Sequence, residues 1–388
     1  MTRFGALARK VDERQAGITL PLLSVSQTRG VLRQSDLSDR PPRADSLDAY
    51  KICRRGDIVF NKMSIRAGAM GVAAEDGLVT YHYEVMRPLS GSDARFISYL
   101  MKSSAFTVEL IKSERGIGAG SDASGVRTTE VPFSVMKKID VWVPPLGEQR
   151  QIAEYLDQET GKIDELITKQ EQLVERLAER LSSLLILSTH EPNLPWKGRL
   201  RQVLAKLDRS AAAGAETVTA FRDGQVTRRS LRREDGYTFS SGDEGYQGVV
   251  AGDLVFHGLD GFAGAVGIAE ETGACSPVYH VTKAKGENSL AYIALLLRAL
   301  GATGFLATQA GNVRQRSVDF RNWTVFARLP IALPEPVEQL RIVGQFRVAQ
   351  TRTSVLASRS IEMVALLRER RAALISAAVT GKIDVRGL

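Results

Sequence analysis

The sequence is poor in the residues that usually hold metals or form disulfides. It has two cysteines, Cys53 and Cys275, and four histidines that do not cluster along its 388 residues. Two thiols cannot make a disulfide framework or a four-ligand metal site. No stretch approaches the roughly 20 apolar residues of a membrane-spanning helix, and the N-terminus has no signal-peptide core. These absences predict a protein without a metal site in a reducing cytoplasm.

Motifs for nucleotide and cofactor chemistry are absent as well. There is no G-x-x-x-x-G-K-[ST] loop for phosphates, and no Asn/Asp-Pro-Pro-aromatic motif of the kind that holds a target amine. A glycine-rich run at residues 116–120 follows a predicted helix instead of a strand, so a surface loop is favoured over a cofactor turn. His82 and Tyr83 could suggest acid–base chemistry, but no carboxylate or nucleophile accompanies them at a shared spacing, which favours packing in the core or against DNA. We expect no catalytic residue.

What the sequence does contain is an internal duplication. Residues 56–85 align without a gap onto residues 252–281, with 13 of the 30 positions identical and a constant offset of 196. A second repeat, at an offset of 190, pairs the Pro-x-x-x-Glu-Gln of residues 144–149 with that of residues 334–339. The chain therefore reads as module, helix, module, helix. The predicted segments are residues 1–143, 144–190, 191–333 and 334–388.

Charge is distributed unevenly over these segments. The net charge is +8, and both modules and the second helical segment are positive, whereas the first helical segment is negative. Basic modules are expected where a protein contacts nucleic-acid phosphates, although solubility alone is the alternative explanation. Opposite charges on the two helical segments favour a direct contact between them.

Both helical segments carry a heptad pattern, which predicts a coiled-coil seam. The seam residues predicted in the first segment are Ile163, Ile167, Gln170, Val174, Leu177, Leu181 and Leu184. Those predicted in the second are Leu356, Ser360, Met363, Leu367, Arg370 and Leu374. Gln170 and Ser360 would cost stability in a seam but could fix its register. Two amphipathic helices packing on separate cores are the alternative, and the shared heptads favour an intramolecular coiled coil.

The connection between the helices allows either relative direction. An antiparallel pair would place the modules at opposite ends of a rod of roughly 60 Å, and a parallel pair would place them side by side. We favour the antiparallel pair. The predicted fold class is α+β, with two pseudo-repeated α/β modules separated by two long helices that form an antiparallel coiled coil.

Each module reads as a mixture of strands and helices. The strands predicted from alternating or continuous apolar residues are 57–62, 84–89 and 139–146 in the first module, and 253–258, 280–285 and 324–334 in the second. Helices are predicted at residues 96–104 and 292–300. Prolines close the last strand of each module before its long helix starts.

At this point the sequence resembles a known family. The run VPPLGEQRQIAEYLDQETGKIDELI at residues 143–167, followed by a heptad helix and a second module, looks like the specificity subunit of type I restriction-modification systems. The C-terminal run at residues 367–388 is similar to the end of those subunits, and the resemblance covers essentially the whole chain. The second copy departs from the pattern, because Thr353 stands where Ile163 does and the TGKID of residues 160–164 recurs only at residues 380–384.

The resemblance implies DNA recognition without catalysis. Each module would be a target recognition domain that reads one half of a bipartite, asymmetric double-stranded DNA target, and the coiled coil would set the gap between the halves. Two modification subunits would bind alongside and methylate adenine with S-adenosylmethionine, and restriction subunits that use ATP and Mg²⁺ could join them. The chain itself would need no cofactor.

DNA-contacting residues are predicted by chemical type and place. Specific readout needs side chains with paired donors or acceptors, and loops after equivalent strands offer candidates that differ between the modules. The base-reading candidates are Asn61, Lys62, Ser64 and Arg66 in the first module, and His257, Asp260 and Phe262 in the second. The candidates for phosphate contacts are Arg115, Arg127, Arg228, Arg229, Arg314 and Arg316. A solvated surface is the alternative for each arginine.

Two other functions stay open from the sequence. A stand-alone DNA-binding scaffold or regulator of the same architecture would act without methyltransferase partners, but it would not need modules with different loops. A nuclease or methyltransferase would need an acidic metal cluster or a cofactor motif, and neither is recognisable in the sequence.

Overall fold

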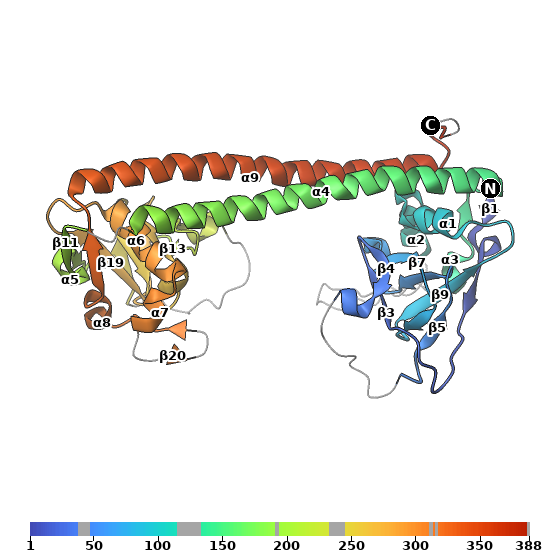
Figure 1. Cartoon of the computed structure of the whole chain (residues 1–388), viewed down its shortest axis with the longest axis horizontal. Coiled ribbons are helices and arrows are strands. Elements are labelled where there is room, and N and C mark those ends of the chain that lie inside the picture. The colour runs from blue at the N-terminus through green and yellow to red at the C-terminus, as the bar shows by residue number, and fades with distance from the viewer. Residues whose placement is uncertain are drawn as a thin grey trace. The chain divides into compact units, whose positions relative to one another are not determined.

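A computed structural model describes residues 1–37, 47–114, 133–190, 194–232, 245–309, 313–314 and 317–385. The chain forms two compact units. Unit 1 comprises Met1–Glu171 and Glu362–Leu388, and unit 2 comprises Gln172–Ile361. Two 44-residue helices, α4 (Leu146–Thr189) and α9 (Pro336–Val379), each contribute one stretch to either unit (Figure 1). No helix within the described residues is long and apolar enough to cross a bilayer.

A four-stranded antiparallel sheet is the centre of unit 1. Its strands follow the order β2-β9-β6-β7, and their bounds are Ala8–Val11, Tyr83–Pro88, Ile58–Asn61 and Met70–Val72. Because side chains alternate between the faces of a strand, Ile58 and Phe60 enter the core beneath the helices, whereas Val59 faces a second core with its register partner Val85. The alternation expected at residues 57–62 is confirmed.

Hairpins and helices cover the two faces of this sheet. The paired strands are β1 (Thr2–Arg3) with β10 (Asp140–Val141), β3 (Leu23–Ser26) with β4 (Gly30–Arg33), and β5 (Lys51–Cys53) with β8 (Gly77–Val79). The helices are η1 (Phe4–Ala6), η2 (Gln34–Asp36), η3 (Ile65–Ala67), α1 (Ala94–Lys102), α2 (Ser104–Glu114) and α3 (Phe133–Met136). Asp93 caps α1, since its side chain accepts hydrogen bonds from two backbone N–H groups of the first turn.

Unit 2 repeats this architecture. Its central sheet has the order β12-β19-β16-β17, with bounds Leu204–Lys206, Tyr279–Ala284, Leu254–His257 and Val266–Ile268. Phe256 enters the core beneath the helices, and Val255 pairs with Val281 on the other face, as Val59 pairs with Val85 in unit 1. The duplication read from the sequence is therefore a duplication of the fold.

The remaining elements of unit 2 are also arranged as in unit 1, with additions. The paired strands are β11 (Trp196–Arg199) with β22 (Pro330–Leu333), β13 (Val218–Ala220) with β14 (Val226–Arg228), β15 (Gln247–Val249) with β18 (Gly273–Cys275), and β20 (Val313–Arg314) with β21 (Ser317–Val318). The helices are α5 (Leu200–Val203), η4 (Arg229–Leu231), η5 (Gly261–Ala263), α6 (Leu290–Ala302), α7 (Phe305–Gln309) and α8 (Trp323–Ala327).

The strand expected over residues 324–334 is wrong in its first half. Residues Trp323–Ala327 form α8, and only Pro330–Leu333 form a strand, β22. The Asn322 side chain accepts a hydrogen bond from the backbone N–H of Thr324 at 2.8 Å and so caps the helix. Phe326 is fully buried, and a short apolar run fits a buried helical turn as well as a strand.

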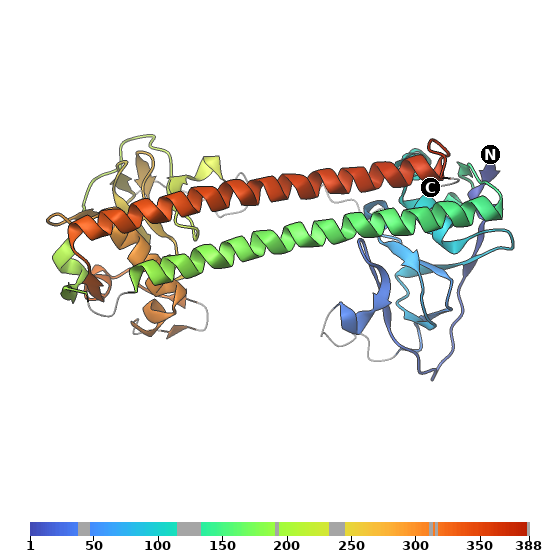
Figure 2. The ribbon, with the colours of Figure 1, turned by 45° about the horizontal axis from the view of Figure 1, so that its top comes forward.

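Within each unit the two long helices run antiparallel. In unit 1 the start of α4, with Ile152 and Leu156, shares a core with the end of α9, with Ile375 and Val379. In unit 2 the end of α4 shares a core with the start of α9. Figures 1 and 2 show the two helices side by side along both stretches. The antiparallel direction expected from the sequence is confirmed.

The seam on α4 follows the predicted heptad up to its last position. Ile163 is buried, and the next predicted residues through Leu181 are half-buried. Leu184 does not belong to the seam, because 36% of it is exposed and Leu185 is buried in its place at 5%. The inner face therefore steps by four at this point, where α4 meets the core of unit 2.

The seam on α9 is shifted at alternate positions. Ser360 and Leu367 are buried and Leu374 is half-buried, as predicted. Leu356 and Met363, however, are each 47% exposed, which corrects their assignment to the seam.

The shift on α9 has a reason in its residue types. The less exposed neighbours of the two misassigned residues are Ala357 and Val364, which correspond to Ile167 and Val174 of α4 at the offset of 190. Position 371, one residue after the predicted Arg370, holds Arg371, whose guanidinium donates to Asp164 of α4 at 2.9 Å. Because some inner positions of α9 hold small or polar residues, the larger exposed side chains beside them fitted the apolar heptad pattern better.

Candidate nucleic-acid interface

The first group of predicted base readers lies in one loop of unit 1. Asn61 ends β6, opposite Tyr83 of β9, and its side-chain oxygen accepts a hydrogen bond from the backbone N–H of Met63 at 3.0 Å. Ser64 directly precedes η3, and Arg66 lies within it and is exposed. The structure thus brings Asn61, Lys62, Ser64 and Arg66 together in the β6–β7 loop, where their contact with DNA stays a prediction.

The equivalent loop of unit 2 is held in the same way by a different side chain. Nδ1 of His257, at the end of β16, accepts hydrogen bonds from the backbone N–H groups of Leu259 at 3.1 Å and Asp260 at 3.0 Å. Burial lowers the pKa of His257, which favours the neutral ring that these bonds require. Asn61 and His257 therefore fix the conformation of their loops. Only the side-chain atoms that do not bond to the loop backbone can contact a ligand.

The other two candidates of this loop differ in their surroundings. The Asp260 carboxylate is 2.9 Å from the guanidinium of Arg222 and partly exposed. Phe262 is half-buried and packs against the main core of unit 2. Packing against the core therefore accounts for the aromatic side chain of Phe262. A base reader needs a more accessible side chain.

The predicted phosphate-contacting arginines are only partly described. Arg228 lies 2.6 Å from Glu216 and 3.0 Å from Glu271, so carboxylates already compensate its charge. Arg33 of unit 1 has the same place, directly before a short helix, and pairs with Glu75 at 2.6 Å. The ion pair that the two units share favours a structural role for Arg228.

The remaining arginines give less information. Arg229 is half-buried and begins η4. Only the backbone of Arg314, in β20, is described. Arg115, Arg127 and Arg316 lie outside the described residues.

The repeated glutamine of each long helix has a clear structural role. The side-chain oxygen of Gln149 accepts a hydrogen bond from the Asp93 N–H at 2.9 Å, and its amide donates to the Pro144 carbonyl at 2.9 Å. Gln339 makes the same two bonds, to the Ser289 N–H and the Pro334 carbonyl, each at 2.9 Å. Both glutamines are buried. They join the start of each long helix to the capping residue of the helix that covers the sheet.

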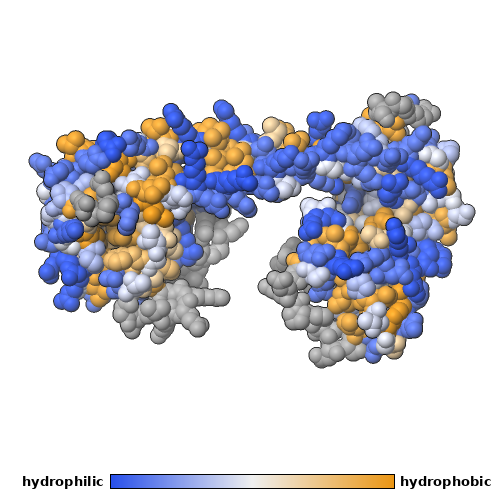
Figure 3. Space-filling view, viewed as in Figure 1, coloured by the Kyte–Doolittle hydropathy of each residue, from blue (hydrophilic) through white to orange (hydrophobic). Residues whose placement is uncertain are grey.

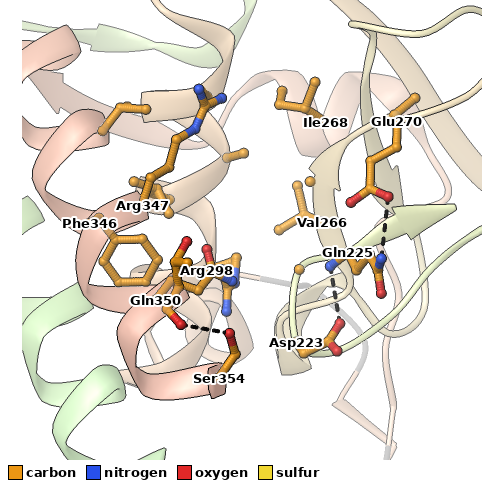
Figure 4. A pocket seen from close by; sticks show the side chains of 18 residues that line it. Asp223, Gln225, Val266, Ile268, Glu270, Arg298, Phe346, Arg347, Gln350 and Ser354 are labelled. Atoms are coloured by element: carbon orange, nitrogen blue, oxygen red, sulfur yellow. Dashed lines mark hydrogen bonds between the residues drawn. The ribbon is translucent and has the colours of Figure 1, made fainter. Parts of the chain in front are cut away.

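A cavity of about 580 Å³ lies in unit 2 between α6, α9 and the β-strands, with Arg347 and Glu270 on opposite walls (Figure 4). In unit 1 the equivalent space holds Tyr99, whose hydroxyl donates to Asp157 at 2.8 Å. Leu295, which lines the cavity of unit 2, stands at the position of this tyrosine. Among the described residues no cluster of three or more His, Cys, Asp or Glu is placed to hold a metal.

Comparisons with known proteins agree with this architecture. Residues 44–176 match the family model of the Type I restriction modification DNA specificity domain. A search of curated proteins found no significant match. A chain from a structure concerned with the complex assembly and conformational transition of the type I R-M system is 16% identical, with a TM-score of 0.71 over 98% of this chain and 97% of that one.

A second solved structure is similar over the same extent. The HsdS subunit from Thermoanaerobacter tengcongensis is 15% identical, with a TM-score of 0.53 over 98% of this chain and 96% of that chain. At these identities the similarity establishes the fold. Residues 44–176 thus match the model of type I restriction-modification DNA specificity domains, in a chain that has the fold of a solved HsdS subunit.

Proposed function

We propose that the chain is the specificity subunit of a type I restriction-modification complex and that each module reads one half of a bipartite, asymmetric DNA target. The observation that carries this proposal is the pairing of one scaffold with two sets of loop residues. Both modules have the same strand order, yet the loop after β6 carries Lys62 and Ser64 where the equivalent loop after β16 carries Gly258 and Asp260. Different side chains on equivalent loops fit two readers of different sequences.

The two long helices would set the gap between the half-sites. Each has 44 residues, which corresponds to about 66 Å of α-helix. A turn of duplex DNA is about 34–36 Å. Helices of this length can therefore bridge readers that act on separate turns. Their antiparallel pairing within each unit supports this role.

Methyltransferase subunits would be the catalytic partners, and the S-adenosylmethionine would be theirs. Exposed apolar side chains on α9 support a partner-binding role, because monomeric proteins seldom expose such rows. Val337 is 80% exposed, Leu340 64% and Val348 53%. In the view of Figure 3, apolar patches interrupt the hydrophilic surface over unit 2. Restriction subunits that use ATP and Mg²⁺ would join the complex where a system contains them.

Co-expression with a type I modification methyltransferase from the same genome tests the proposal. The complex is purified, and the DNA of the expressing cells is sequenced by a single-molecule method that detects N6-methyladenine. We expect methylation at a split motif that disappears when this chain is omitted. Methylation that does not depend on the chain, or at a continuous motif, would contradict the proposal.

The alternative of a stand-alone DNA-binding regulator makes a different prediction. The chain would then bind DNA without any methyltransferase and would leave no methylated motif. DNA binding by the purified chain, combined with failure to co-purify any methyltransferase, would favour the regulator.

A further inference from the structure

We propose that Tyr81 and His82 form an aromatic contact to DNA that belongs to the first module alone and helps to determine its half-site. This inference rests on the proposed function and goes beyond it by naming a second readout element, separate from the β6–β7 loop. The two residues occupy the turn between β8 and β9. Tyr81 is 54% exposed, His82 is exposed, and their ring centroids are 4.0 Å apart.

The turn does not need aromatic residues to form. The backbone N–H of Tyr83 donates to the Thr80 carbonyl at 3.0 Å, so Tyr81 and His82 are the two central residues of a β-turn. Central positions of such turns favour proline, glycine, asparagine and aspartate. Two neighbouring aromatic rings there expose apolar surface without contributing to the turn itself.

Unit 2 builds the same turn with ordinary residues. The backbone N–H of Tyr279 donates to the Ser276 carbonyl at 3.1 Å, which places Pro277 and Val278 at the central positions. Proline is favoured at the first of these because its φ angle is already suitable. The fold is thus the same with and without the aromatic pair, and the pair is a feature of the first module only.

The turn is attached to a rigid base. The ammonium group of Lys51, which is 2% exposed, donates to the Tyr83 carbonyl at 2.8 Å and lies 3.4 Å from the buried carboxylate of Glu84. The Tyr83 hydroxyl is hydrogen-bonded to Ser24 at 3.1 Å. The residue that follows the aromatic pair is therefore held at both its backbone and its side chain. A contact surface fixed in advance loses little entropy when it binds.

The pair lies at the same edge of the sheet as the predicted base readers. Tyr83 is the register partner of Asn61, so the turn that precedes Tyr83 and the loop that follows Asn61 project from the same end of β9 and β6. That loop carries Lys62, Arg66 and Met63, and Met63 is 46% exposed. Cations beside exposed apolar and aromatic side chains match the chemistry of a DNA groove, where phosphates border base edges and thymine methyl groups.

The test replaces the aromatic turn with the turn that unit 2 already uses. The double variant Tyr81→Pro/His82→Val keeps a turn of known compatibility with this fold and removes both rings. It is assembled with the methyltransferase, and its affinity is measured on duplexes with both half-sites intact or with either half-site scrambled. We expect a loss of about tenfold or more on intact DNA. We expect no difference from wild type when the half-site of the first module is scrambled.

A matched variant in unit 2, Val278→Ala, provides the control and should bind intact DNA like wild type. If the wild-type complex reads two half-sites and the double variant reads both of them as well as wild type does, this inference alone is overturned. An equal loss on every duplex, or a loss of methyltransferase assembly with unchanged DNA readout, would overturn it too. A wild-type complex without any half-site preference would instead contradict the proposed function.

Discussion

A basic side chain occupies the same position on the helix beneath α4 and α9 in both units. It is Lys102 in α1 of unit 1 and Arg298 in α6 of unit 2. Burial, together with repulsion from the nearby Arg371, lowers the pKa of Lys102 to about 8, and Asp164 opposes the shift. Burial also lowers the pKa of Arg298. At this position, therefore, the fold places positive charge where water is scarce, and the charge costs stability.

Lys102→Met tests that cost through its dependence on pH. Between pH 8 and about 10.5 the folded protein has released the Lys102 proton, whereas the unfolded chain still binds it, so stability gains with rising pH in this window. We expect Lys102→Met to raise the free energy of unfolding at pH 7 by about 1–3 kcal/mol, and the gain over wild type to shrink by pH 10.5. Chemical denaturation at several pH values measures both effects.

Lys112→Met is the matched control for this experiment. Lys112 is exposed and pairs with Glu109 on the same helix at 2.6 Å, so its replacement should change stability by less than about 0.5 kcal/mol at either pH. If Lys102→Met destabilises the protein at pH 7, the burial of Lys102 is not a net cost.

At the scale of elements, the long helices differ in how well their sequences report their inner faces. The inner face of α4 carries large apolar residues such as Ile163, and its heptad was predicted nearly to the end. Alternate inner positions of α9 hold Ala357 and Arg371, so at these positions the exposed neighbours looked more like a seam than the inner residues did. The antiparallel partner decides which face is buried, and no property of α9 alone contains that information.

The same substitution at two leucines of α9 tests whether Leu356 lies outside the seam. Leu367 is 9% exposed and Leu356 is 47% exposed. Leu367→Ala should lower the free energy of unfolding by about 2–4 kcal/mol, because it leaves a cavity in a buried seam. Leu356→Ala should cost less than about 1 kcal/mol. Thermal or urea unfolding of the two variants gives the comparison, and a loss for Leu356→Ala as large as that for Leu367→Ala would return Leu356 to the seam.

At the scale of the whole molecule, one folded module occurs twice, and the two copies differ mainly where they are exposed. Buried pairs such as Val59–Val85 and Val255–Val281 repeat without change. The glutamine of the repeated Glu-Gln pair is conserved in both chemistry and contacts. Turns and loops differ, as in the aromatic turn of unit 1 and the proline turn of unit 2. Under the proposed function, this separation would let each module change its target without loss of the fold.

Removal of one heptad from both long helices tests the role of the helices as a spacer. Seven residues fewer shorten each helix by about 10 Å and keep the heptad phase. We expect the methylated motif to keep both half-sites while the gap between them shortens by about three base pairs. Single-molecule sequencing of the methylated DNA measures the gap. An unchanged gap with intact half-sites would show that the helices do not set it.

The sequence by itself determined the duplication, the two long helices, the alternation of the central strands and the resemblance to a DNA specificity subunit. These features follow from local periodicity or from comparison of the chain with itself. Tertiary structure decided the phase of the α9 seam, the helix at Trp323–Ala327, the bonds of Gln149 and Gln339, and the use of His257 and Phe262 inside the module. Each of these depends on which side chain a distant segment covers, because burial and hydrogen bonding involve both the side chain and the segment packed against it.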